Sequence, residues 1–151
     1  MKSGTIPKES ALPFGELFEM FRSSIKGHEC GAIVTFTGTV RGDSKDGDAG
    51  VAKTRQIEIE AIEGVSSGVL QRIATETEAL AGIHKVVIIH LTGTFELGEP
   101  MVHVFISSAH RSEGFKALEN VVDRYKKETP LWKKEIYSDG SSRWISHQAP
   151  R

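Results

Sequence analysis

A histidine, an arginine and a serine follow directly after an apolar run, where a helix is expected to begin. His110, Arg111 and Ser112 come after Val102–Ile106 and open a helix predicted over Ser112–Lys127. Free backbone N–H groups at a helix N-terminus, with Ser112 as the N-cap residue, favour an anion. The imidazole and the guanidinium would add charge-assisted donors. The pattern also fits an arginine that pairs with a surface carboxylate, so both interpretations stay open here.

Two pairs of lysines lie farther along the chain. Lys126 and Lys127 fall in the last turn of the same helix, where the helix dipole alone favours cations by roughly 0.3–1 kcal/mol. Lys133 and Lys134 fall in a predicted strand and therefore point to opposite faces, with Lys133 on the face of Glu135. Lys133 is then either an ion-pair partner of Glu135 or a lysine whose pKa is lowered by partial burial and nearby cations, positioned by Glu135 for acid–base chemistry.

Arg41 ends a predicted strand beside a polar loop, which places it either to bind a ligand phosphate or to remain solvated. Phe36 of the same strand is expected in the core. Nothing near Cys30 in sequence would activate it, so a small buried hydrophobe is favoured over a nucleophile. The chain contains no GxSxG, P-loop, GxGxxG or HExxH pattern, and its histidines show no metal-ligand spacing, so neither a metal nor a cofactor is predicted.

The hydrophobic periodicity predicts an α+β protein of one domain over residues 1–151. The elements do not alternate regularly as βαβ units, which argues against a doubly wound parallel sheet. Leu80 and Phe115 are among the residues expected to face inward. A mobile loop is expected at 42–53, a turn-rich connection at Gly93–Pro100 and a loose tail at 147–151. The predicted helices are Pro13–Ile25, Val65–Leu80 and Ser112–Lys127, and the predicted strands are Gly31–Arg41, Gln56–Ile62, Ile83–Leu91, Met101–Ser108, Trp132–Tyr137 and Arg143–Ser146.

The composition of the chain argues against several classes of function. The 151 residues include 19 Lys plus Arg against 20 Asp plus Glu, a net charge of −1, and this near neutrality argues against a general nucleic-acid binder. The apolar stretches are too short to cross a bilayer and no signal segment opens the chain, so a cytoplasmic protein is expected. The C-terminal third is mildly basic, which suits a small anionic ligand.

Three blocks of the sequence together resemble the large, catalytic subunit of molybdopterin synthase. They are GAIVTFTGTVRG at 31–42, SAHR at 108–111 and YKKETPLWKKE at 125–135, and the Arg143-Trp144 pair is a weaker match. The resemblance implies an α/β-hammerhead fold with an added antiparallel β subdomain, and a homodimer. It also implies a small ubiquitin-like sulfur carrier as partner, whose C-terminal tail inserts into this subunit, giving a heterotetramer with two carriers.

The implied reaction transfers two sulfurs from the carrier's thiocarboxylate to cyclic pyranopterin monophosphate (precursor Z), which forms the dithiolene of molybdopterin. Such an enzyme needs no cysteine nucleophile, because the partner carries the sulfur. The resemblance assigns catalytic roles to Lys133 and Lys126. It assigns substrate binding or support of the site to Arg41, His110, Arg111, Phe36, Lys134, Glu135 and Arg143, the last across the dimer.

The sequence departs from the family pattern at Ala61-Ile62, at Val65-Ser66 and at Leu91 after His90. A leucine at position 91 removes one possible anion contact. These departures leave open an alternative, a non-catalytic homologue that only binds a ubiquitin-like carrier. A phosphate-ester or nucleotide-binding enzyme is a further alternative, and RNA binding through Lys126–Lys134 is the least favoured because of the net charge.

Overall fold

The computed structural model describes residues 1–42 and 53–145. The loop expected at 42–53 lies almost entirely outside the described residues, and the tail expected at 147–151 lies wholly outside them.

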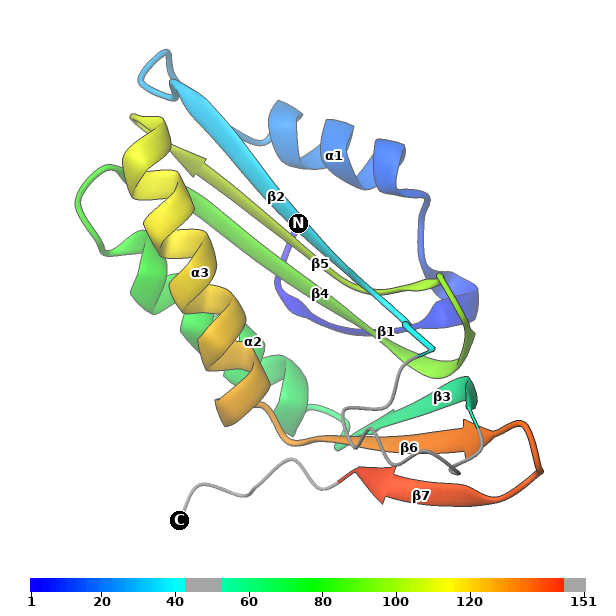
Figure 1. The fold of residues 1–151 in the computed structure, drawn as a ribbon. Coiled ribbons are helices and arrows are strands. Elements are labelled where there is room, and N and C mark those ends of the chain that lie inside the picture. Colours follow the sequence, from blue (N-terminus) through cyan, green and yellow to red (C-terminus); the bar gives the residue numbers. More distant parts are fainter. Residues whose placement is uncertain (43–52, 146–151) are drawn as a thin grey trace.

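Within the described residues, seven strands form one sheet in the order β2-β5-β4-β3-β6-β7, with β1 paired separately to β4 (Figure 1). All pairings are antiparallel except that of β1 with β4, and the three α-helices lie against the sheet, which confirms the α+β prediction. The strands are β1 (Gly4–Pro7), β2 (Ala32–Thr39), β3 (Thr54–Ala61), β4 (Ile83–Glu96), β5 (Pro100–Ser108), β6 (Leu131–Tyr137) and β7 (Ser142–Ile145). The helices are α1 (Phe14–Ser23), α2 (Val65–Glu78) and α3 (Arg111–Glu128), with a short 3₁₀ turn, η1, at Lys8–Ser10.

The long strand β4 joins the two halves of the sheet. Its first part pairs with β5, and its last residues, Gly93–Glu96, pair with β3. The turn-rich connection predicted over Gly93–Pro100 is therefore wrong for Gly93–Glu96, because Phe95 is fully buried opposite Ile57 and continues the strand. The turn itself lies at Leu97-Gly98, within the predicted range. Gly93 has φ 119°, a conformation that favours glycine, where β4 passes from one half of the sheet to the other.

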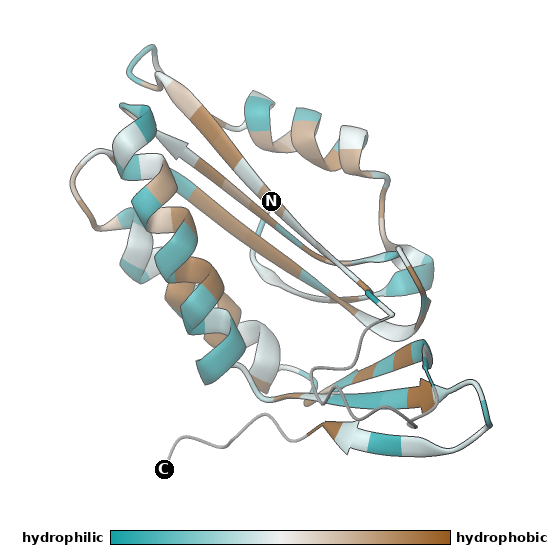
Figure 2. Ribbon diagram, viewed as in Figure 1, coloured by the Kyte–Doolittle hydropathy of each residue, from teal (hydrophilic) through white to brown (hydrophobic). Residues whose placement is uncertain are grey.

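Helices cover both faces of the β2-β5-β4 half. Helices α2 and α3 pack on one face and α1 lies on the other (Figure 1). Figure 2 shows that hydrophobic residues dominate β4 and β5, which are sandwiched between these layers. Strand β1, which was not predicted, runs parallel to the middle of β4, and four residues without apolar alternation carry too little signal to reveal it.

Two side chains expected to face inward are exposed. Leu80 is 53% exposed because α2 ends at Glu78, and Phe115 is 60% exposed because α3 buries a different stripe. The buried stripe contains two of the smallest residue types, so α3 approaches the sheet closely: a Cβ at Gly114 would lie 2.7 Å from the Ser108 Oγ. Its members are Gly114, Ala117, Val121 and Tyr125.

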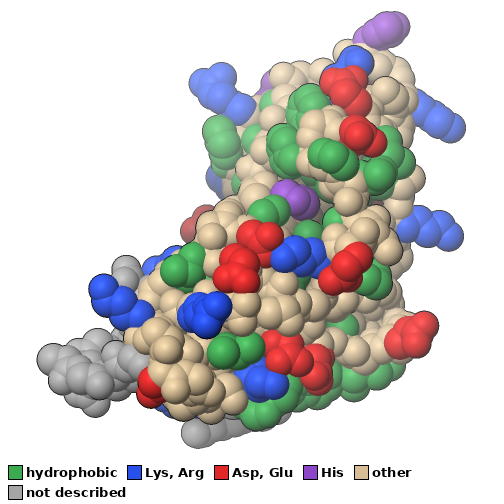
Figure 3. All heavy atoms as spheres, turned by 90° about the vertical axis from the view of Figure 1, so that its right-hand side faces the viewer, with side chains coloured by type: hydrophobic (Ala, Val, Ile, Leu, Met, Phe, Trp, Pro, Cys, Tyr) green, Lys and Arg blue, Asp and Glu red, His purple; other side chains and the backbone are tan. Residues whose placement is uncertain are grey.

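Helix α1 likewise leaves apolar side chains at the surface, and these gather at the top of the face in Figure 3.

Candidate active site

Lys133 lies on the inward face of the β3-β6-β7 part of the sheet. It is the third residue of β6 and pairs in register with Ile59 of β3, which is almost completely buried. Leu131 and Tyr137, two and four residues away on the same strand face, are also buried. Burial lowers the pKa of the half-buried Lys133 ammonium, and the positive charge of Lys126 lowers it further. The structure therefore places a lysine with a depressed pKa beside a second cation.

Lys126 comes from a different element, the last turn of α3. That helix leads directly into β6 (Figure 1). The charge of Lys126 acts on Lys133, so the two lysines lie near each other where the helix ends and the strand begins. Lys126 itself is exposed. A depressed lysine pKa increases the neutral fraction near neutral pH, which is the form that can accept a proton or act as a nucleophile.

The neighbours of Lys133 on β6 have other partners. Glu135 accepts a hydrogen bond from the Tyr137 hydroxyl at 2.7 Å, and no Lys133–Glu135 ion pair forms between these two described side chains. Tyr137 is a supporting residue that the sequence analysis missed, although strand alternation places it on the face of Glu135. Lys134 points to the opposite, outward face, where it forms an ion pair with Glu58 at 2.7 Å and lies over the Trp144 ring.

Two further predicted site residues come from β2 and the residues after it: Phe36 lies within the strand and Arg41 follows its end. Arg41 follows the end of the strand, is exposed, and forms no ion pair with another described residue. The neighbouring Gly42 lies near the Leu97 side chain and the Thr54 carbonyl, so β2 exits toward the start of β3. Phe36 is half-buried and packs against the core beneath α2 and α3. Arg143 lies on β7 opposite Glu135, on the strand face of Lys133.

His110 and Arg111 lie at the other end of α3. Arg111 begins the helix and Lys126 is in its last turn, a separation of about 22 Å at 1.5 Å per residue. Both side chains are exposed. The prediction of Ser112 as N-cap is wrong: His110 occupies that position, and the Ser112 hydroxyl donates to Glu113 instead. A single chain therefore does not bring His110 and Arg111 to the lysine pair.

The departures from the family pattern fall outside the lysine pair. Leu91 is buried in the apolar core with Phe95 and Leu131, so it does not face an anion site in this fold. Ile62 is exposed and, with Glu60, Ala61, Trp132 and Trp144, lines a shallow hollow of about 380 Å³ on the outward face of the sheet.

Direct titration should detect the influence of Lys126 on Lys133. We expect the Lys133 pKa, followed by NMR of the lysine side-chain methylene groups, to lie below the ordinary 10.5 and to rise in Lys126→Ala. Because the folded state binds this proton less tightly than the unfolded chain, the charged ammonium costs stability at neutral pH. That cost disappears as the pH rises through the folded pKa toward 10.5. A Lys133 pKa that is equal in Lys126→Ala and the wild type would contradict the coupling.

Within residues 1–42 and 53–145, no group of three or more His, Cys, Asp or Glu side chains is arranged to hold a metal ion. None of the helices described is long and apolar enough to cross a membrane.

The fold and the site define a class: an α+β protein in which a helix and the following strand bring two lysines together, one of them partly desolvated. The sequence matches the MoaE protein family over residues 10–128, and the chain belongs to that family. This match confirms the resemblance drawn from the three sequence blocks.

Named relatives agree with this assignment. The chain is 36% identical over 124 residues to the molybdopterin synthase catalytic subunit of Bacillus subtilis, covering 82% of this chain and 75% of that protein. It is 39% identical over 110 residues to a probable molybdopterin synthase of Haloferax volcanii, covering 72% of this chain but only 41% of the relative. The crystal structure of molybdopterin synthase from Staphylococcus aureus superposes with a TM-score of 0.81 at 30% identity, covering 97% of this chain and 99% of that one.

Proposed function

We propose that this chain is a sulfurtransferase, the catalytic subunit of a molybdopterin synthase. It takes sulfur from the C-terminal thiocarboxylate of a small ubiquitin-like carrier and delivers it to cyclic pyranopterin monophosphate, in molybdenum cofactor biosynthesis. Family membership and the names of the relatives support the reaction. The observation that carries the residue assignment is the partly desolvated Lys133 beside Lys126.

Lys133 has the central chemical role in this proposal. Addition of a thiocarboxylate sulfur to a pterin carbon requires proton movement at the reacting atoms, and a lysine with a lowered pKa can both accept and return a proton near neutral pH. Lys126 remains exposed beside it, where a cation attracts the carrier's anionic terminus or the substrate phosphate. Glu135, held by Tyr137, supports the same strand face.

The length of α3 supports a site shared between two copies of the chain. About 22 Å separates the start of the helix from its last turn, which is farther than one pterin phosphate spans. A homodimer that brings His110 and Arg111 of one copy toward the lysine pair of the other would supply the anion-binding donors that a single chain places too far away. Arg143 on β7 is the further residue that we expect to act across the dimer.

The outward face of the β3-β6-β7 sheet is our candidate for the dimer interface. Trp132 and Trp144 are 44% and 48% exposed and line the shallow hollow described above. Strand β7 is also the last strand in the sheet order, so its outer edge carries no other described strand. Exposed aromatic residues beside an open strand edge are typical of surfaces that associate.

Replacing Trp144 tests this interface. We expect Trp144→Ser to shift the chain from dimer to monomer in sedimentation equilibrium at micromolar concentration. Met20→Ser is the control, because Met20 is a comparably exposed apolar residue (47%) on α1, away from this sheet face. An unchanged dimer in Trp144→Ser, or equal dissociation in both variants, would reject this surface as the interface.

Reconstitution decides between the enzyme and the alternative, a non-catalytic carrier-binding module. The purified chain is mixed with a thiocarboxylated carrier from the same source and precursor Z, and molybdopterin is assayed by the fluorescence of its oxidised derivative. Product formation supports the enzyme. A stable complex with the carrier but no product would favour the binding module, with Ala61-Ile62 as the first positions to examine.

The family also implies an α/β-hammerhead arrangement with an added antiparallel subdomain. We assign the antiparallel unit to β3, β6 and β7, which carries Lys133 on its inner face; the antiparallel pairing of these strands supports this assignment.

A further inference from the structure

The eight residues from Lys126 to Lys133 include the connection between α3 and β6. This connection is anchored to α2. Thr129 leaves the helix with an extended backbone, φ −83° and ψ 125°, as expected for a residue that precedes proline. Pro130 has a restricted φ and no N–H, so its carbonyl is its only backbone hydrogen-bonding group. A group that binds this carbonyl therefore helps to fix the start of β6, in addition to the pairing of Leu131 with Ala61.

The Pro130 carbonyl accepts a hydrogen bond from the Ser66 hydroxyl at 2.8 Å. The same Ser66 oxygen accepts a hydrogen bond from the Ile62 backbone N–H at 3.1 Å. Ser66 is completely buried in the first turn of α2. Its hydroxyl therefore links the end of β3 to the start of β6, at the point where Ala61 and Leu131 pair in the sheet.

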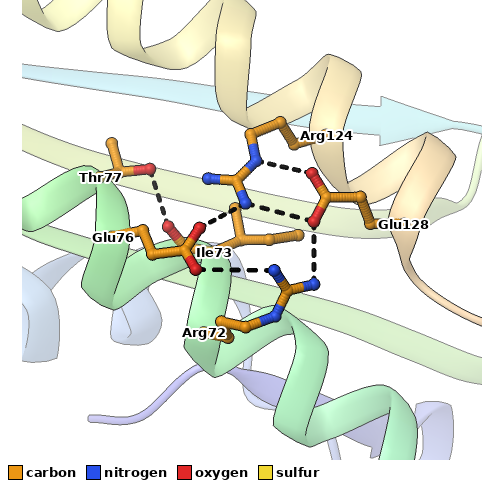
Figure 4. A network of polar contacts seen from close by, with 6 residues as sticks. All are labelled: Arg72, Ile73, Glu76, Thr77, Arg124 and Glu128. Carbon is orange, nitrogen blue, oxygen red and sulfur yellow. Dashed lines mark hydrogen bonds and ion pairs between the residues drawn. The ribbon is translucent and has the colours of Figure 1, made fainter.

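A second contact joins the same connection to α2. Glu128, the last residue of α3, accepts hydrogen bonds from Arg124 of its own helix and from Arg72 of α2, at 2.7 and 2.9 Å (Figure 4). Arg124 also forms an ion pair with Glu76 of α2. These side chains are partly exposed, so water screens them, whereas the Ser66 hydrogen bonds are shielded.

We propose that Ser66 is a positioning residue of the active site: its hydroxyl, held between the Ile62 N–H and the Pro130 carbonyl, fixes the start of β6 and so sets Lys133 against Lys126. Ser66 touches no reacting group. It acts through Pro130, which lies three residues before Lys133 in the chain. A displacement of about 1 Å at a reacting group can lower the rate by up to about 10²-fold.

The charged groups around Lys133 make its titration a sensitive measure of position. Lys126 comes from α3, Glu135 and Tyr137 from β6 and Arg143 from β7. On this face β3 contributes the uncharged Thr54, Ile57, Ile59 and Ala61. If β6 is released, water reaches Lys133 and its distance from Lys126 increases. Both changes raise the Lys133 pKa toward the ordinary value.

The test compares Ser66→Ala with Thr77→Val. Thr77 is a matched control, because its buried hydroxyl also lies on α2 but donates only to the Ile73 carbonyl of its own helix (Figure 4). We expect Ser66→Ala to lower kcat by about 10-fold or more with little change in KM, and to move the pH–rate profile and the NMR-detected Lys133 pKa upward. Thr77→Val should lose similar thermal stability without either shift.

Equal pKa shifts in the two variants, or an unchanged Lys133 pKa and pH profile in Ser66→Ala, would overturn the assignment. If Ser66→Ala does not fold, Ser66→Cys replaces it, since a thiol still fills this position but is a weaker donor and should give a smaller shift in the same direction. An absent shift in Ser66→Cys would equally count against the proposal. Only the kinetic measurement rests on the proposed function, because the NMR titration needs neither carrier nor pterin. The titration therefore separates a failure of positioning from a failure of the proposed reaction.

Discussion

Replacing Lys133 by methionine is expected to lower molybdopterin formation by about 10²- to 10⁴-fold, the range that one positioned acid–base group supplies. Methionine keeps most of the aliphatic stem that packs on the inward face of β6 and removes only the ammonium. Because burial already disfavours the charged lysine there, the variant should be at least as stable as the wild type at neutral pH.

The measurement is single-turnover product formation with saturating thiocarboxylated carrier. Lys127→Met is the matched control, because Lys127 is an exposed neighbour of Lys126 in the last turn of α3. Its rate should stay within a factor of about two of the wild type, a change of under about 0.5 kcal/mol, as expected for a surface substitution. Near-normal turnover in Lys133→Met, with the dimer and carrier complex intact, would remove Lys133 from the chemistry.

Replacing Arg41 by alanine is expected to act mainly on substrate binding. The Arg41 guanidinium is exposed at the end of β2, and the proposed function assigns it to the substrate phosphate. A charge-assisted hydrogen bond contributes about 1.5–3 kcal/mol, which corresponds to about a 10- to 100-fold rise in the KM for precursor Z.

Steady-state kinetics at several precursor concentrations separate this effect from a loss of kcat. Arg22→Ala is the control, because Arg22 is an exposed arginine on α1 whose ion-pair partner among the described residues is Glu19 of the same helix. Raising the ionic strength should weaken precursor binding in the wild type more than in Arg41→Ala. An unchanged KM in Arg41→Ala would show that this arginine does not contact the substrate.

The local pattern of the sequence was enough to predict most elements and the geometry within each of them. Alternation along β6 predicted Lys133 and Lys134 on opposite faces. The structure confirms this, because Lys134 lies on the outward face and forms an ion pair with Glu58. Helical spacing placed Lys126 in the last turn of α3. Local pattern failed where a short or irregular segment depends on its partner: β1 forms because β4 is beside it, and β4 continues through Gly93 because β3 extends the sheet there.

The sequence by itself therefore determined which side chains share a face of a strand or of a helix, since this follows from a repeat of two or 3.6 residues along the chain. Only the tertiary structure decided which face of β6 is buried, and hence that Lys133 is the lysine with the lowered pKa. It also separated His110 and Arg111 from Lys126 by the length of α3, and joined Ser66 to Pro130 across 64 positions of the chain. Burial and distant contacts depend on which surfaces pack together, and no local periodicity encodes that choice.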